Sequence, residues 1–182
     1  MVKAKIPALQ GKDDITFGDL EDQGCKPLKL VASNIAGRRA EVFCIENENG
    51  SQSVIKAIRA SSSYPGLFKP VHSGDKVYVD GGLSSNLPAF LFAEEHERNQ
   101  LPTITFDLVS QNNANLNSIA GFAGSMLDTA LEASDQIIGN MIEGSLRVLV
   151  NIPPNITTLK FDLEQHDILN LFNAGKLSLI HI

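Results

Sequence analysis

Short apolar runs alternate with polar segments that contain glycine, proline or asparagine along this chain. Five of these runs, most of which contain β-branched residues, are interpreted as strands. They span residues 29–33, 40–45, 76–80, 103–109 and 147–152. The first two runs are separated by Asn34 to Arg39, a segment whose asparagine and glycine suit a turn. We therefore expect these two strands to form a hairpin.

Apolar positions spaced three and four residues apart predict helices between the strands. The first helix covers residues 53–61 and ends before Pro65, because the residue before a proline avoids the α region. Its apolar face is expected to carry Val54, Ala57, Ile58 and Ser61. A second helix begins at Pro88 and extends to about Asn99, and the longest helical pattern covers 119–142.

The two ends of the chain differ in character. Residues 1–14 are mixed in charge and interrupted by proline and glycine, so we expect a loose arm, followed by a short ordered turn over 15–20. A last helix is expected to be capped by Asp162 or Asp167 and to stop at Gly175. Strands that alternate with helices in this way predict the α/β class.

Composition and charge exclude several classes of function. The 182 residues include 15 Lys and Arg against 21 Asp and Glu, a net charge of -6. We expect no nucleic-acid partner, because phosphate binding needs clustered cations and the only tight basic pair is Arg38–Arg39.

We also expect no transmembrane segment, since the longest apolar run is far shorter than a membrane-spanning helix, and we expect no secretory signal. Cys25 and Cys44 lack redox or metal-binding spacing, which favours free thiols in the cytoplasm.

The candidate for chemistry is Asp80, which ends a predicted strand and is followed by Gly81 and Gly82. A carboxylate at the end of a strand is held on rigid backbone, and glycines let the chain turn sharply with close neighbours. That position suits an aspartate that orients or deprotonates a nucleophile, beyond the carboxyl end of a strand in an open α/β sheet. By itself the triplet is weak evidence for a site, because Asp-Gly is a common pair in plain turns.

The surroundings of this triplet resemble the C-terminal part of a patatin-like phospholipase domain. The stretch Ala-Ser-Ser-Ser-Tyr-Pro-Gly-Leu-Phe at 60–68 and the segment 79–88 around Asp80 are both similar to family motifs. Further resemblance lies upstream, at 16–20 and 26–32, and downstream from 157–163 to 174–175, so that it covers roughly residues 15 to 176. We therefore assign 15–182 to this part of the domain.

The resemblance implies a serine acylhydrolase that acts on a lipid ester through a Ser-Asp dyad, with no histidine, metal or cofactor. In such a mechanism the serine attacks the ester carbonyl while the aspartate takes its proton, and backbone N–H groups of a glycine-rich loop bind the oxyanion. Only the aspartate carries over to this sequence, as Asp80, together with the motif glycines Gly81 and Gly82.

The serine of the dyad has no counterpart among these residues. The family nucleophile lies in Gly-x-Ser-x-Gly at a strand-to-helix elbow, and no serine here has glycine on both sides at that spacing. The nearest miss, Ser84, lies inside the aspartate motif itself. The glycine-rich oxyanion loop is missing too, so we expect an open sheet flanked by helices that lacks the N-terminal strands carrying both elements.

Three hypotheses follow from this pattern. In the first, the chain is part of a lipid acylhydrolase and is inactive alone, as an incomplete record, a truncated chain or a polypeptide complemented by the missing N-terminal part of the domain. In the second, it is a non-catalytic lipid-binding or protein-interaction module derived from the patatin fold, and a location at membrane surfaces stays open. The third, an unrelated α/β domain with a chance turn, does not explain several matching segments in family order.

Overall fold

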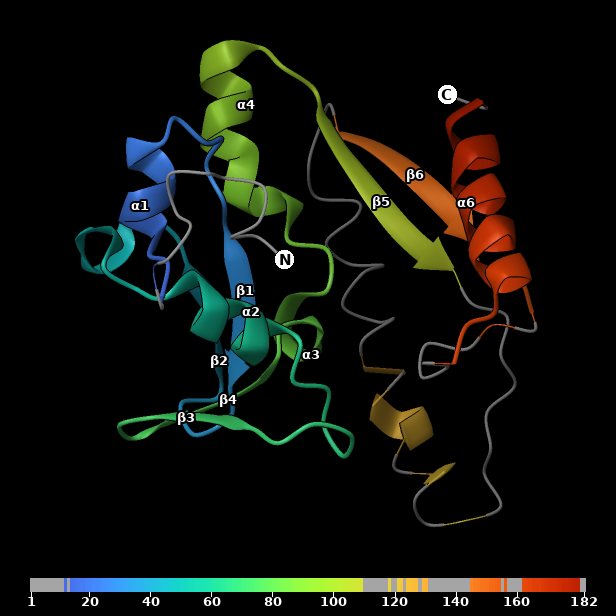
Figure 1. Ribbon diagram of the computed structural model, residues 1–182, viewed down its shortest axis with the longest axis horizontal. Coiled ribbons are helices and arrows are strands. Elements are labelled where there is room, and N and C mark those ends of the chain that lie inside the picture. The colour runs from blue at the N-terminus through green and yellow to red at the C-terminus, as the bar shows by residue number, and fades with distance from the viewer. Residues whose placement is uncertain are drawn as a thin grey trace. The chain divides into compact units, whose positions relative to one another are not determined.

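The protein is described here from a computed structural model (Figure 1). The described residues are 12, 14–109, 118, 121–122, 124–127, 129–130, 145–154, 156 and 162–180. Most of the predicted arm, and most of the helical pattern over 119–142, therefore lie outside the described residues. The chain divides into two compact units, Met1–Pro88 and Ala89–Ile182, and each unit is described by itself.

The first unit is built on a four-stranded antiparallel sheet with the order β2-β1-β4-β3. The strands are β1 (Leu30–Asn34), β2 (Arg39–Phe43), β3 (Val71–Ser73) and β4 (Lys76–Asp80). The predicted hairpin is confirmed, since β1 and β2 pair in register from Leu30 opposite Phe43 to Asn34 opposite Arg39. Strand β3 was not predicted. It forms a second hairpin with β4 across Gly74, whose φ of 59° lies in the left-handed region that glycine favours.

This unit also contains two capped helices. Strands β1 and β2 and the 3₁₀ turn η2 (Asn47–Gly50) lie between them along the chain. Helix α1 (Phe17–Asp22) begins at Thr16, whose hydroxyl accepts the Asp19 N–H while the Asp19 side chain accepts the Thr16 N–H. Helix α2 (Val54–Ser61) begins at Ser53, whose side chain accepts the Lys56 N–H. The predicted turn at 15–20 is thus the start of a helix, and the predicted helix over 53–61 is confirmed.

Helix α2 packs against β1 and β4, as Figure 1 shows. Its buried residues are Val54, Ala57 and Ala60, whereas Ile58, which we placed on the same face, is 38% exposed. The buried face is therefore rotated from the predicted one, with Ala60 in the place that we expected for Ile58. Ala60 packs with Ala32 of β1 and Tyr78 of β4 in one buried cluster.

The chain after β4 turns directly into the short helix α3 (Gly82–Ser85). The helix that we predicted from Pro88 is divided in the structure. It consists of a 3₁₀ turn, η3 (Ala89–Phe92), followed by α4 (Ala93–Asn99). The prediction was therefore correct about helical character in this stretch and wrong about one continuous α-helix.

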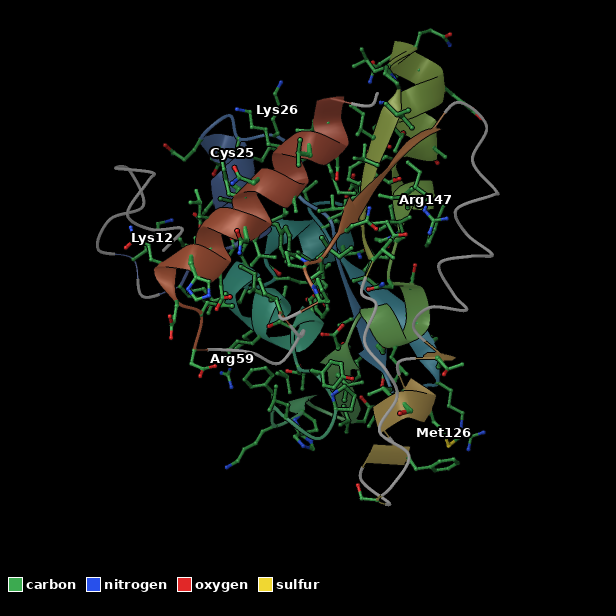
Figure 2. All side chains as sticks on the ribbon, turned by 90° about the vertical axis from the view of Figure 1, so that its right-hand side faces the viewer. Lys12, Cys25, Lys26, Arg59, Met126 and Arg147 are labelled. Carbon is green, nitrogen blue, oxygen red and sulfur yellow. The ribbon has the colours of Figure 1, made fainter. Side chains whose placement is uncertain are left out.

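The second unit contains the only parallel strands among the described residues, β5 (Thr103–Val109) and β6 (Ser145–Asn151). An ion pair between Asp107 of β5 and Arg147 of β6 joins the two strands, and Arg147 is labelled in Figure 2. Helix α6 (Gln165–Ile180) packs against β6. The chain thus contains helices together with antiparallel and parallel strands, and the predicted α/β class is confirmed.

Helix α6 corrects the prediction for the C-terminal segment. The helix continues through Gly175, because packing against β6 offsets the roughly 1 kcal/mol that a glycine costs inside a helix. Asp167 is fully buried in the first turn, where its carboxylate accepts the Glu164 N–H at 3.3 Å. Asp167 is therefore the third residue of the helix and bonds to the residue before the helix, rather than being the N-cap itself.

None of the helices described here is long and apolar enough to cross a membrane. Both cysteines carry free thiols: Cys44 is buried, and Cys25 is partly buried where the chain leaves α1 (Figure 2).

Candidate active site at the end of strand β4

Asp80 is the last residue of β4, as the sequence predicted, and the backbone around it is tied to the end of α2. The Asp80 N–H donates to the Ser63 carbonyl at 2.9 Å, and the Gly81 N–H donates to the Ser61 carbonyl at 3.1 Å. Ser61 and Ser63 belong to the motif at 60–68. The two motifs singled out in the sequence therefore contact each other through successive backbone hydrogen bonds.

Strand β4 is antiparallel to both of its neighbours, which changes one part of the prediction. The rule that sites lie beyond the carboxyl ends of strands concerns parallel sheets, so it does not account for the place of Asp80. The local contacts do: Asp80 pairs with Ala32 across the sheet, on the face that α2 covers.

Gly81 allows a close approach between the turn and the central strand. A Cβ atom at this position would lie 2.1 Å from the Val31 carbonyl oxygen and 2.7 Å from the Val31 carbonyl carbon. Both are backbone atoms of β1, which leaves no space for a side chain. We expected from the sequence that glycine permits such an approach, and the structure shows that strand β1 makes it.

The Asp80 carboxylate is partly buried and is held by the turn that follows it. The Gly82 N–H donates to Asp80 Oδ1 at 2.9 Å. Burial raises the pKa of Asp80 above its ordinary value, while the hydrogen bond from Gly82 acts in the opposite direction and is weaker. A carboxylate with a raised pKa is a stronger base than an exposed one, which suits removal of a proton near neutral pH.

This balance predicts that Asp80→Asn stabilises the protein at neutral pH. Because the pKa of Asp80 is raised in the folded state, its ionisation costs stability, and this cost is fully present above the folded-state pKa. An asparagine keeps the acceptor for the Gly82 N–H and removes the charge. We expect the melting temperature at pH 7 to rise by a few degrees, with the gain disappearing as the pH falls below the ordinary pKa of aspartate.

The matched control for this measurement is Asp75→Asn, in the exposed turn between β3 and β4. Calorimetry of both variants between pH 3 and 8 would separate the two positions. A fall in the melting temperature of Asp80→Asn would indicate that the charge holds the turn together and would contradict the prediction.

Two serines beside Asp80 are already committed to structural hydrogen bonds. The hydroxyl of Ser63 donates to the Arg59 carbonyl within α2, and that of Ser33 donates to the Asp80 carbonyl. Both serines are almost fully buried, at 4% and 2% exposure. Neither has the exposed position that a nucleophile needs.

Two small pockets lie in the described part of the chain. One pocket lies beside α1 and is lined by residues including Phe17 and Cys25, and another lies beside β5 and is lined by residues including Phe92 and Ile104. Asp80 lines neither of them. Among the residues that the structure describes, no three His, Cys, Asp or Glu side chains gather as metal ligands.

Comparison with known proteins identifies relatives of the chain. The family model described as patatin-like phospholipase matches residues 2–93, about half of the chain. The match begins before residue 15, the position at which we expected the resemblance to start. The NTE family protein Rv2565 of Mycobacterium tuberculosis is 62% identical over 37 residues, which make up 20% of this chain and 6% of that protein. The probable lipid hydrolase 463L of Invertebrate iridescent virus 6 is 25% identical over 84 residues, 46% of this chain and 29% of that protein.

Among solved structures, VipD from Legionella pneumophila is similar in fold. It aligns with a TM-score of 0.57 and 17% sequence identity, over 91% of this chain and 34% of that chain. The likeness extends the shared fold beyond the region of the family match and confirms a patatin-like α/β architecture. The matched parts make up about a third or less of each of these three proteins.

Proposed function

This chain belongs to the patatin-like phospholipase family, and from that membership we propose that it forms part of a lipid acylhydrolase to which it contributes the aspartate of a Ser-Asp dyad. Within that enzyme, residues 15–182 form the C-terminal part of the patatin-like domain. The substrate class is a lipid ester, supported by the family and by the printed name of 463L as a probable lipid hydrolase.

The observation that supports this proposal is the place of Asp80. Its carboxylate lies at the end of β4, inside the matched region, on a turn whose backbone is tied to α2 and to β1. Burial raises its pKa, as a general base requires. In the proposed mechanism a serine hydroxyl attacks the ester carbonyl, Asp80 takes the proton, the alcohol leaves, and water then hydrolyses the acyl-serine.

We propose that the serine and the oxyanion donors come from outside these 182 residues, which contain no Gly-x-Ser-x-Gly. A base without its nucleophile has nothing to activate, so the chain alone is expected to be inactive. This is measured with a p-nitrophenyl acyl ester and the purified chain. Hydrolysis that disappears in Asp80→Ala would show a nucleophile within the chain and would contradict this part of the proposal.

The role of Asp80 is tested in a chimera in which residues 15–182 replace the matching segment of an active family member that has Gly-x-Ser-x-Gly. We expect the chimera to hydrolyse the ester and Asp80→Asn to lower kcat by about 10²- to 10⁴-fold, the usual contribution of a general base. Asp75→Asn is the control and should leave kcat unchanged. Full activity of the Asp80→Asn chimera would overturn the assignment.

A non-catalytic module is the second candidate function, favoured by the same lack of a nucleophile motif. It predicts that the chain binds phosphatidylcholine liposomes in a sedimentation assay and that Asp80→Asn binds equally well. An active chimera that depends on Asp80 would exclude this reading of the site.

A further inference from the structure

Ser33 is a polar residue in the centre of the sheet of the first unit, and its side chain is 2% exposed. It lies on β1 opposite Val79, one position before the end of β4 in the pairing of these strands. Its hydroxyl donates to the Asp80 carbonyl at 2.8 Å and lies 3.4 Å from the Gly81 carbonyl, also with hydrogen-bonding geometry. The hydroxyl thus contacts both carbonyl groups of the turn that carries Asp80.

These contacts help to hold two peptide planes, and the Gly81 carbonyl of the second plane also accepts the N–H groups of Ser84 and Ser85 at 3.1 and 2.9 Å. The Asp80 carbonyl shares a peptide plane with the Gly81 N–H, which donates to Ser61, so that plane is held from both sides. The Gly81 carbonyl shares the next plane with the Gly82 N–H, which donates to the Asp80 carboxylate. The orientation of the second plane therefore decides whether the carboxylate keeps its hydrogen bond.

We propose that Ser33 is a positioning residue for Asp80: its buried hydroxyl holds the Asp80–Gly81–Gly82 backbone so that the Gly82 N–H orients the carboxylate toward the serine of the dyad. This inference rests on the proposed function, because the orientation matters for catalysis only if Asp80 takes the proton. Ser33 touches no reacting atom and acts through the backbone alone.

The test compares Ser33→Ala and Ser33→Cys in the full chain. Cysteine has the same shape as serine with a somewhat larger terminal atom and is a weak donor, whereas alanine has no donor. If the hydroxyl positions the turn, both variants should weaken the hydrogen bond from the Gly82 N–H and so raise the Asp80 pKa further above its ordinary value, as measured by carboxyl NMR. Hydrogen exchange of the Gly82 amide should become about five- to tenfold faster.

Thr16→Ala is the control for general destabilisation, because it removes the cap of α1 in the same unit and contacts neither Asp80 nor Ser33. It should lower the melting temperature without moving the Asp80 pKa. The proposal is overturned if Ser33→Cys behaves like the wild type, which would indicate packing alone, or if Thr16→Ala changes the Asp80 pKa equally. A Ser33→Ala chain that does not fold leaves the decision to Ser33→Cys.

The catalytic consequence is read in the active chimera. Ser33→Cys should lower kcat by about tenfold with KM unchanged, and the acid limb of the pH profile should shift with the Asp80 pKa. If Asp80→Asn abolishes activity and Ser33→Cys leaves it unchanged, the positioning role fails and the proposed function stands. If Asp80→Asn retains activity, the proposed function fails, whatever the NMR titration shows for Ser33.

Discussion

Replacing Gly81 by alanine is expected to destabilise the first unit by about 3 kcal/mol or more, the upper end of the range for inserting an atom into a closely packed site. The added Cβ would lie 2.1 Å from the Val31 carbonyl oxygen. No side-chain rotation relieves this contact, because the Val31 atoms that the Cβ would meet belong to the backbone. Strands β1 and β4 would have to separate by roughly 1 Å, which would break the hydrogen bonds of Ser33 to the turn.

Urea unfolding followed by circular dichroism measures this loss, which is a large part of the roughly 5–15 kcal/mol that stabilises a typical domain. The matched control is Gly175→Ala in α6, where no atom outside the local helix backbone lies within 4 Å of the added Cβ. There the same substitution should stabilise the helix by about 0.5–1 kcal/mol. If Gly81→Ala unfolds within 0.5 kcal/mol of the wild type, the close approach to β1 does not constrain this position.

Local patterns in the sequence predicted the elements around the site because each carries its own signal. Ser53 caps α2, Pro65 follows its end, and the glycines after Asp80 mark the turn out of β4. The three-residue strand β3 was missed because it is too short for a periodic pattern. The turn at Gly74 could have indicated it, since a glycine between two β-rich segments is a hairpin signal.

Contacts between distant residues could not be predicted in the same way. Ser33 and Asp80 are 47 positions apart, and the sequence around Ser33 looks like any buried strand. The rotation of α2 that buries Ala60 and exposes Ile58 depends on the sheet beneath it, which is a tertiary effect. The same holds for Gly175, where contact with β6 outweighs the low helix propensity of glycine.

Glu41 shows a further long-range effect, and it bears on how β4 is held. Its carboxylate, on β2, accepts hydrogen bonds from the Tyr78 hydroxyl at 2.6 Å, Asn34 Nδ2 at 2.8 Å and Lys76 Nζ at 2.9 Å, and it is paired with Arg39. These donors come from β1, β2 and β4. Because Tyr78 and Asp80 lie on the same face of β4, the network holds the strand two residues before the proposed catalytic carboxylate.

The network lowers the pKa of Glu41 to about 2. Burial alone would raise the pKa, but the hydrogen bonds from Tyr78, Asn34, Lys76 and Arg39 together outweigh it. The pKa of Tyr78 rises to about 12, through burial and through its hydrogen bond to Glu41. Since the folded-state pKa of Glu41 is below its ordinary value, the ionised carboxylate stabilises the folded protein above about pH 4.5. That contribution is lost as the pH falls through about 2.

Glu41→Gln is therefore expected to destabilise the protein at pH 7 by about 2 kcal/mol, allowing for solvent screening of a side chain that is 15% exposed. The difference from the wild type should shrink as the pH falls from 5 and approach zero near pH 2, as measured by urea unfolding at each pH. A double-mutant cycle with Tyr78→Phe should give a coupling of about 1 kcal/mol or more at pH 7, because the two side chains share one hydrogen bond. A difference that stays constant down to pH 2 would mean that the charge of Glu41 contributes nothing and that only its packing against β4 matters.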